Sequence, residues 1–225
     1  NQILDVRKID KQQMHLHCQP TEMVGFIGGI FKMFEFNAKN RGITFNYEHD
    51  DLNKLNAWID RSQFDKVVTN LLSNAFKYSE DGGEITMTLQ KQKSEKTDDA
   101  GSFVLSVIDN GAGLDDENLK HIFERFYQGS NSRRLHIAGT GIGLNLCKMI
   151  VDMHHGSIEA HNRKGESGAV FEVCLPLGNG HLSPNEIDDT PEEIEVIEPA
   201  PAAAPAKSGT KHRVLIVDDD AEIGR

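Results

Sequence analysis

The chain has 225 residues, of which 38% are hydrophobic and 26% charged, so it is long and apolar enough to form one or two soluble domains. Its formal net charge of −11 argues against a nucleic-acid-binding surface, which needs clustered lysine and arginine. The three cysteines, Cys18, Cys147 and Cys174, have no CxxC spacing, which argues against a disulfide framework and a zinc site and fits a reducing compartment.

The N-terminal quarter predicts two helices and two strands. Asn1–Asp10 has the apolar spacing of a helix that is too short to fold alone, so it is interpreted as the tail of a longer helix. The sequence also lacks an initiator methionine, a signal peptide and a run of about 20 apolar residues, so we expect it to be an excised piece. The remaining elements are a strand at Met14–Gln19, a helix capped by Thr21 that ends near Gly42, and a strand at Ile43–Glu48.

The clearest helix of the chain follows a short strand at Ala57–Ile59. Asp60 is placed to cap it, and its apolar stripe is Phe64, Val67, Val68, Leu71, Leu72 and Ala75. Two strands, Ile85–Leu89 and Phe103–Asp109, then predict a hairpin.

The rest of the predicted domain alternates irregularly between helix and strand. We expect a short helix at Leu119–Phe123, a helix at Leu144–Met153, and strands at Ser157–His161 and Ala169–Leu175. This mixed order favours an α+β two-layer sandwich, with a mixed sheet packed on helices, over a doubly wound sheet.

Residues 178–211 differ in composition from what precedes them. They hold five of the seven prolines and seven acidic residues against two lysines, which predicts an extended linker. The apolar run Val214–Val217 beyond it is typical of a buried parallel strand, so a new domain is expected to begin at 212.

Four motifs in the middle of the chain carry chemistry. Asn70 and Asn74 share a helix face beside Lys77, so two amide oxygens and an ammonium can converge on magnesium and phosphates. Alternatively, both asparagines are merely solvated. Asp109 ends a strand and precedes Gly111 and Gly113, a pattern that suits either an exocyclic amine beside a flat ring or an ordinary turn.

The other two motifs surround a long polar loop. The glycines of Gly139-Thr140-Gly141-Ile142-Gly143-Leu144 precede a helix N-terminus, where free N–H groups favour phosphate, although a lone GxGxG is common. Ile122–Tyr127 is an aromatic cluster ahead of a loop with Arg133 and Arg134, which predicts either a loop anchor or a mobile lid.

In this order and spacing, the four motifs resemble the N, G1, F and G2 boxes of sensor histidine kinases, and the resemblance spans about residues 14–177. It implies a Bergerat ATP-binding fold in a histidine kinase catalytic domain (13–177) that uses ATP and Mg²⁺. The resemblance also implies that Asn74 ligates magnesium and, with Lys77, serves catalysis near the phosphates alongside Asn70.

The same resemblance assigns roles to the remaining motif residues. Tyr78 lines the nucleotide pocket, Asp109 holds the adenine amine, and Gly111 and Gly113 shape the adenine site. The phosphate contacts and lid hinge are expected from Gly139, Thr140, Gly141, Gly143 and Leu144, with Arg133 or Arg134 reaching the phosphates.

The family transfers the γ-phosphoryl group of ATP to a histidine on a dimeric helical hairpin, whose acceptor motif is absent from this sequence. Residues 1–12 resemble the end of that hairpin. Residues 212–225 resemble the first strand of a receiver domain, where Asp218 and Asp219 match its magnesium ligands. The parent protein is therefore expected to be a homodimeric hybrid kinase, with this part on the cytoplasmic side of a bacterial inner membrane.

Two other readings remain open. Gyrase-type and chaperone ATPases share the fold but place a water-activating glutamate where this chain has Asn70. A degenerate module that uses the fold only for protein contacts is the second alternative.

Overall fold

A mixed five-stranded sheet is the centre of the structure, a computed structural model that describes residues 2–49, 54–93, 101–128 and 140–188. The strands stand in the order β2 (Thr44–Glu48), β4 (Glu84–Gln92), β5 (Ser102–Asp109), β7 (Ala169–Pro176) and β6 (Ser157–Asn162). β2 and β4 pair in parallel, and the other neighbours pair antiparallel. The predicted hairpin is confirmed, because Ile85 of β4 lies opposite Asp109 of β5.

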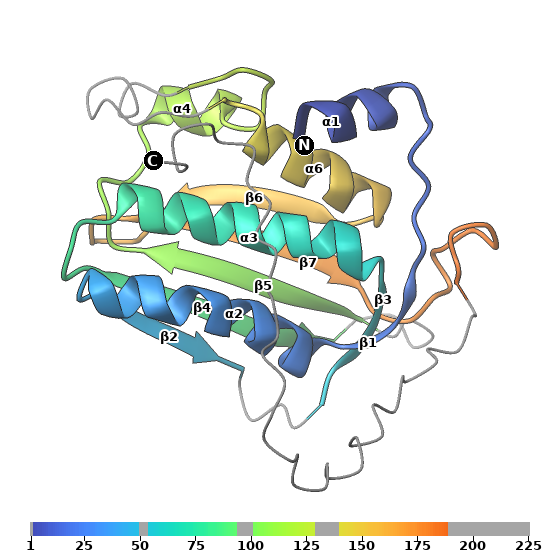
Figure 1. Cartoon of the computed structure of the whole chain (residues 1–225), viewed down its shortest axis with the longest axis horizontal. Coiled ribbons are helices and arrows are strands. Elements are labelled where there is room, and N and C mark those ends of the chain that lie inside the picture. The colour runs from blue at the N-terminus through green and yellow to red at the C-terminus, as the bar shows by residue number, and fades with distance from the viewer. Residues whose placement is uncertain (1, 50–53, 94–100, 129–139, 189–225) are drawn as a thin grey trace, which may run out of the picture. The chain divides into compact units, whose positions relative to one another are not determined.

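Three helices cover one face of this sheet: α2 (Met23–Asn40), α3 (Arg61–Tyr78) and α6 (Gly143–Met153) (Figure 1). Alternate residues of β5 face them, so that Phe103, Leu105 and Val107 are fully buried. The architecture confirms the predicted α+β two-layer sandwich. Among the described helices, none is long and apolar enough to cross a membrane.

The described part of the chain also contains two short helices. α1 (Gln2–Asp10) confirms the helix expected at the N-terminus. α4 (Asp116–His121) begins three residues before the helix expected at 119–123.

Two predictions near the N-terminus are wrong. A strand is expected at Met14–Gln19, but the strand of this region, β1, spans Gln19–Glu22. It pairs antiparallel with β3 (Asn56–Ile59). The alternation that suggested a strand reflects the burial of Leu16 and Cys18 in a small separate cluster. The cap of α2 is Glu22 and not Thr21, because the Glu22 carboxylate accepts hydrogen bonds from the first-turn N–H groups of Val24 and Gly25, at 3.0 and 2.7 Å.

The packed unit extends past the expected linker boundary at 178. Leu182 is buried against Leu16 and Cys18, although its neighbours in the sequence, His181 and Ser183, are polar. The Cys18 N–H donates to the Glu186 carbonyl at 2.7 Å, and the Asp188 N–H donates to the Cys18 carbonyl at 2.8 Å. Residues 178–188 are therefore held against the segment that follows α1, through backbone bonds that composition alone does not reveal.

A buried histidine connects α6 to the N-terminus of α3. His154 is 1% exposed, and its Nδ1 lies 2.8 Å from the Ile150 carbonyl while its Nε2 lies 3.1 Å from the Asp60 N–H. Because a carbonyl only accepts and an N–H only donates, Nδ1 carries the proton and the ring is neutral. Burial, the largest influence, lowers the pKa of His154, whereas the bond to Ile150 acts in the opposite direction.

This lowered pKa predicts acid destabilisation. Below the ordinary histidine pKa of about 6.5, His154 is protonated in the unfolded chain. In the folded chain it stays neutral until the pH reaches its lower folded-state pKa. The free energy of unfolding therefore has its full value above that pH. As the pH falls from there to the folded-state pKa, each pH unit lowers it by about 1.4 kcal/mol. Denaturant unfolding between pH 7.5 and 5 measures this slope. His154→Gln, which is always neutral and keeps an acceptor, is expected to flatten it; equal slopes in both proteins would contradict the assignment.

Candidate functional site

Helix α3 presents the first group of site residues. Asp60 caps it by accepting hydrogen bonds from the N–H groups of Ser62 and Gln63, at 3.0 and 3.1 Å. All six residues of the predicted apolar stripe are buried. Because one face of the helix is fixed on the sheet, Asn70, Asn74 and Lys77 are turned to its opposite side, where all three line a cavity.

The second group comes from the end of β5. The Asp109 carboxylate is 4% exposed, and its Oδ1 accepts hydrogen bonds from the N–H groups of Gly111 and Ala169, at 2.9 and 3.2 Å. Burial raises the pKa of Asp109, while these two bonds and the Arg163 charge act in the opposite direction. Both of these bonds end on Oδ1, so Oδ2 is the acceptor left for a donor on a ligand.

Two glycines allow the loops around Asp109 and α6 to approach their neighbours. A Cβ on Gly111 would lie 2.4 Å from the Tyr78 carbonyl oxygen, so a larger residue would push the loop off α3. Gly141 has a φ of +66°, and its Cβ would lie 2.7 Å from the backbone of Phe126. These contacts join the β5 loop to α3 and the start of α6 to residues 126–127.

These groups meet in one cavity of about 280 Å³. It brings together ten residues that the sequence singled out: Asn70, Asn74, Lys77, Tyr78, Asp109, Gly113, Thr140, Gly141, Gly143 and Leu144. Gly111 stands just outside the lining, against Tyr78. The predicted residues Arg133, Arg134, Gly139, Asp218 and Asp219 lie outside the described residues.

The cavity also has walls that sequence reasoning did not assign. They are formed by Gln2, Ser73, Ala112, Leu114, Ile122, Tyr127, Gln128, Ala169 and Phe171. Some carried a signal: Ser73 is three residues from Asn70, Ile122 and Tyr127 belong to the aromatic motif, and Ala169 and Phe171 alternate along β7. Gln2 carried none, because its approach to the cavity depends on how α1 docks.

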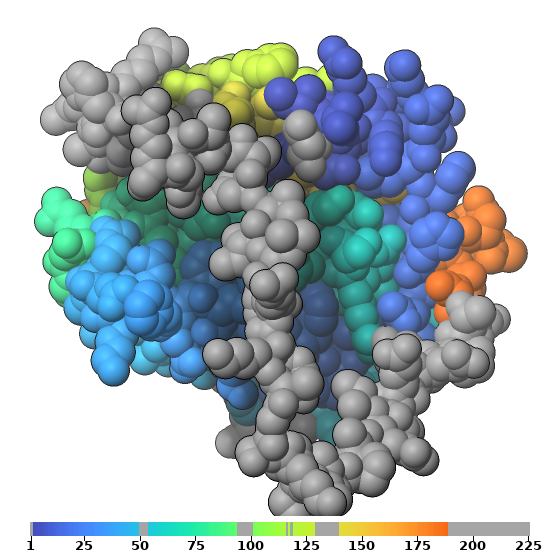
Figure 2. All heavy atoms as spheres, in the orientation of Figure 1, coloured from blue at the N-terminus to red at the C-terminus, as the bar shows by residue number. Residues whose placement is uncertain are grey.

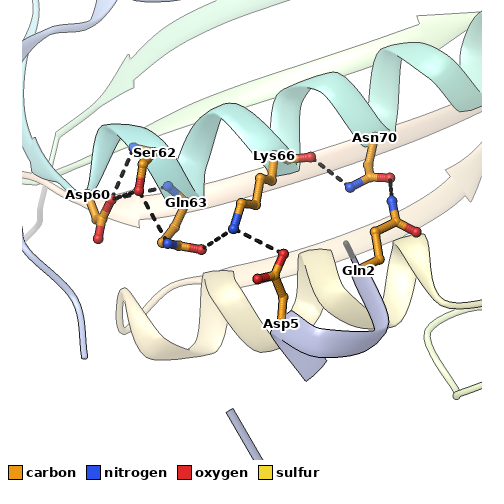
Figure 3. Close-up of polar contacts among 7 residues, drawn as sticks. All are labelled: Gln2, Asp5, Asp60, Ser62, Gln63, Lys66 and Asn70. Carbon is orange, nitrogen blue, oxygen red and sulfur yellow. Dashed lines mark hydrogen bonds and ion pairs between the residues drawn. The ribbon is translucent and has the colours of Figure 1, made fainter. Parts of the chain in front are cut away.

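Helix α1 makes polar contacts with α3 (Figure 3), and its Gln2 forms part of the cavity wall. The Gln2 side-chain amide donates to Asn70 Oδ1 at 2.7 Å, and Asn70 Nδ2 donates to the Lys66 carbonyl at 2.8 Å. Lys66 in turn pairs with Asp5 at 3.1 Å. The Asn70 amide is thus fixed with its oxygen turned away from its own helix backbone.

Two further contacts hold α1 in this position. Val6 is 9% exposed and belongs to the main core, and Arg125 makes a two-pronged ion pair with Asp10. Figure 2 shows α1, in dark blue, as part of the surface beside the teal α3. The exposed ion pair contributes little by itself, so Val6 is the main anchor.

The chemistry of the lining fits a phosphorylated compound with a flat ring. The Lys77 ammonium and the N-terminus of α6, which has no side-chain cap, can bind phosphate groups. The amide oxygens can bind an associated cation. Leu114, Ile122 and Phe171 supply apolar walls near a buried acceptor, Asp109. Among the described residues, no cluster of three or more histidine, cysteine and acidic side chains is placed to hold a metal ion.

Comparison with known proteins agrees with this geometry. Residues 59–179 match the family model described as histidine kinase-, DNA gyrase B- and HSP90-like ATPase. Histidine kinase P4 of Formosa agariphila is 34% identical over 83% of this chain, and sensor histidine kinase TmoS of Ectopseudomonas mendocina is 32% identical over 99%. The chain spans 13% and 23% of the lengths of these two relatives.

A solved structure shows the same arrangement. The catalytic domain of histidine kinase ThkA, in a nucleotide-free form, is 26% identical and superposes with a TM-score of 0.61. The match covers 72% of this chain and 97% of that domain.

The docking of α1 predicts a measurable effect of Val6. Val6→Ala removes two buried carbons, each contributing about 0.8 kcal/mol, and a helix of this length does not persist undocked. Hydrogen exchange of the α1 amides is therefore expected to accelerate about tenfold. The control is Ile3→Ala, because Ile3 is 49% exposed. If both variants exchange alike, Val6 is not the anchor.

Proposed function

The chain belongs to the family of histidine kinase-, DNA gyrase B- and HSP90-like ATPases, and we propose that it is the catalytic domain of a two-component sensor histidine kinase that binds ATP with Mg²⁺. The observation that carries the proposal is the convergence of Asn70, Asn74 and Lys77 with the buried Asp109 in one cavity. An adenine nucleotide joins the two chemistries that this lining offers, because it carries an amine on a flat ring and a polyphosphate.

In this proposal Asp109 recognises the base. Its Oδ2 accepts a hydrogen bond from the adenine amine, and Oδ1 stays occupied by the N–H groups of Gly111 and Ala169. The carboxylate is thereby held in one orientation before the nucleotide arrives, which lowers the ordering cost of binding. Tyr78 and Gly113 line the same cavity and enclose the base.

The phosphates lie along α3 and the N-terminus of α6. Lys77 neutralises charge on the phosphate oxygens, and the first N–H groups of α6 donate to them. Asn74, with Asn70 nearby, would hold magnesium through its amide oxygen, a hard ligand of the kind that this ion accepts. When bound, the ion neutralises charge that develops as the γ-phosphoryl group departs.

The reaction proposed is phosphoryl transfer to a histidine nitrogen on another domain. The nitrogen attacks the γ-phosphorus, the bond to the bridging β–γ oxygen breaks, and ADP leaves. This chain positions the nucleotide and stabilises charge, which is the greater part of catalysis in such transfers.

Hydrolysis is the less favoured alternative. Asp109 is the only acidic residue among the described residues of the lining, and its Oδ1 is engaged with backbone N–H groups. Position 70 carries an amide that is bonded to Gln2 and to the Lys66 carbonyl, and an amide does not deprotonate water. The other alternative, a module that uses the fold only for protein contacts, is tested by measuring whether the chain binds ATP.

The proposal extends to both ends of the chain. Residues 1–12, which include α1, are the end of the hairpin domain that carries the acceptor histidine. Residues 178–211 contain the linker, and residues 212–225 begin a receiver domain with Asp218 and Asp219 as its first magnesium ligands. The partners are then this hairpin, the receiver or a response regulator, and a second copy of the parent at the cytoplasmic face of a bacterial inner membrane.

Titration calorimetry of ATP into the chain, with and without Mg²⁺, tests the proposal. We expect saturable binding that magnesium strengthens. In Asn74→Ala the magnesium-dependent gain is expected to fall by about 1.5–3 kcal/mol, the usual contribution of a polar bond to a charged partner. Asn46→Ala, which changes an asparagine of β2 outside the cavity, is the matched control. Absence of ATP binding by the unaltered chain would leave only the contact module.

The base assignment is tested by Asp109→Asn. The new amide oxygen still accepts from Gly111 and Ala169, but an N–H₂ group replaces Oδ2 and meets the adenine amine donor to donor. ATP affinity is expected to fall by about 1–3 kcal/mol, whereas inosine triphosphate, which has a carbonyl in place of the amine, is spared. An equal loss for both nucleotides would sink the assignment, and thermal unfolding checks that the fold survives.

A further inference from the structure

The loop that forms one wall of the cavity is held from outside by the β6–β7 hairpin. Residues 110–115 connect β5 to α4, and Ala112, Gly113 and Leu114 line the cavity. Asn110 ties the start of this loop to β4, because its Oδ1 accepts a hydrogen bond from the Glu84 N–H at 2.8 Å. The far end of the loop needs a separate support.

Asn162, the last residue of β6, supplies that support. Its Oδ1 accepts a hydrogen bond from the Leu114 N–H at 2.7 Å, and its Nδ2 donates to the Leu114 carbonyl at 2.6 Å. One side-chain amide thus satisfies both backbone groups of a residue 48 positions away, in the same reciprocal way as a neighbouring strand. Both bonds lie outside the β6–β7 ladder, so they support the loop and not the strand.

The turn after Asn162 adds a second contact to the same loop. Ser167 Oγ donates to the Gly111 carbonyl at 2.6 Å, and the Ala169 N–H bonds Asp109. The Arg163 N–H donates to the Gly168 carbonyl at 3.1 Å, which closes the turn. The hairpin end therefore fixes the loop at Gly111 and Leu114, as well as the carboxylate that precedes it.

We infer that Asn162, assisted by Ser167, is a positioning residue that sets how selectively the cavity accepts adenine. Neither residue lines the cavity, so both act through the loop. The bond from Oδ2 of Asp109 to the amine forms only when the ring is held at the correct place, and Gly113 and Leu114 are the part of the wall whose position Asn162 sets. This inference rests on the proposed function, because it needs Asp109 to read the base.

The test measures the affinities of ATP and inosine triphosphate for the unaltered chain and for Asn162→Ala. We expect the variant to lose about tenfold in ATP affinity, and much less in inosine triphosphate affinity, as one net hydrogen bond's contribution is lost from the loop. The adenine preference therefore falls, which general destabilisation of the fold would not cause. The matched control is His161→Ala, because the neighbouring His161 pairs with Glu172 instead of the loop.

Ser167→Ala is the second variant. It removes one hydrogen bond from an exposed turn, so it is the safer change for folding, and the same preference is expected to fall by about threefold. If the preference for ATP over inosine triphosphate is unchanged in Asn162→Ala, the positioning role is overturned, while the proposal that the chain binds ATP still stands. Ser167→Ala decides the question if Asn162→Ala does not fold. If the unaltered chain fails to bind ATP, both the proposed function and this inference are overturned.

Discussion

The burial of the apolar face of α3 governs both the packing of the fold and the placement of the site residues. Its apolar stripe is buried in the helix layer that covers the sheet, and the buried cap at Asp60 fixes where the helix begins. A helix held in this way has no freedom to rotate, so Asn70, Asn74 and Lys77 are placed on the cavity side by the same packing that stabilises the fold. Contacts with Gln2 and the Lys66 carbonyl then fix the orientation of the Asn70 amide.

Asp109 shows how a costly group is retained at the site. A buried carboxylate is unfavourable unless it is bonded, and the N–H groups of Gly111 and Ala169 supply that compensation. These donors come from the loop after β5 and from the start of β7, so the carboxylate also ties two strand ends together. The base end of the cavity is consequently rigid, because its recognition group is part of the sheet.

The opposite wall is of a different character. α1 is short and rests on one buried valine, the Gln2–Asn70 bond and two ion pairs with Asp5 and Asp10. Surface ion pairs contribute little, so this wall opens more easily than the sheet. Because Gln2 donates to the Asn70 oxygen, the position of α1 bears directly on the phosphate end of the cavity.

The strands of the main sheet and the α3 cap could be predicted from the amino-acid sequence, because they follow from local periodicity and from side chains that bond their near neighbours. Contacts between residues that are distant in the sequence could be seen only in the folded chain. The docking of residues 178–188, the approach of Gln2 and the Asn162–Leu114 pair all depend on partners dozens of residues away. A polar side chain looks the same in a sequence whether it faces solvent or a buried backbone group, and only the folded chain supplies that partner.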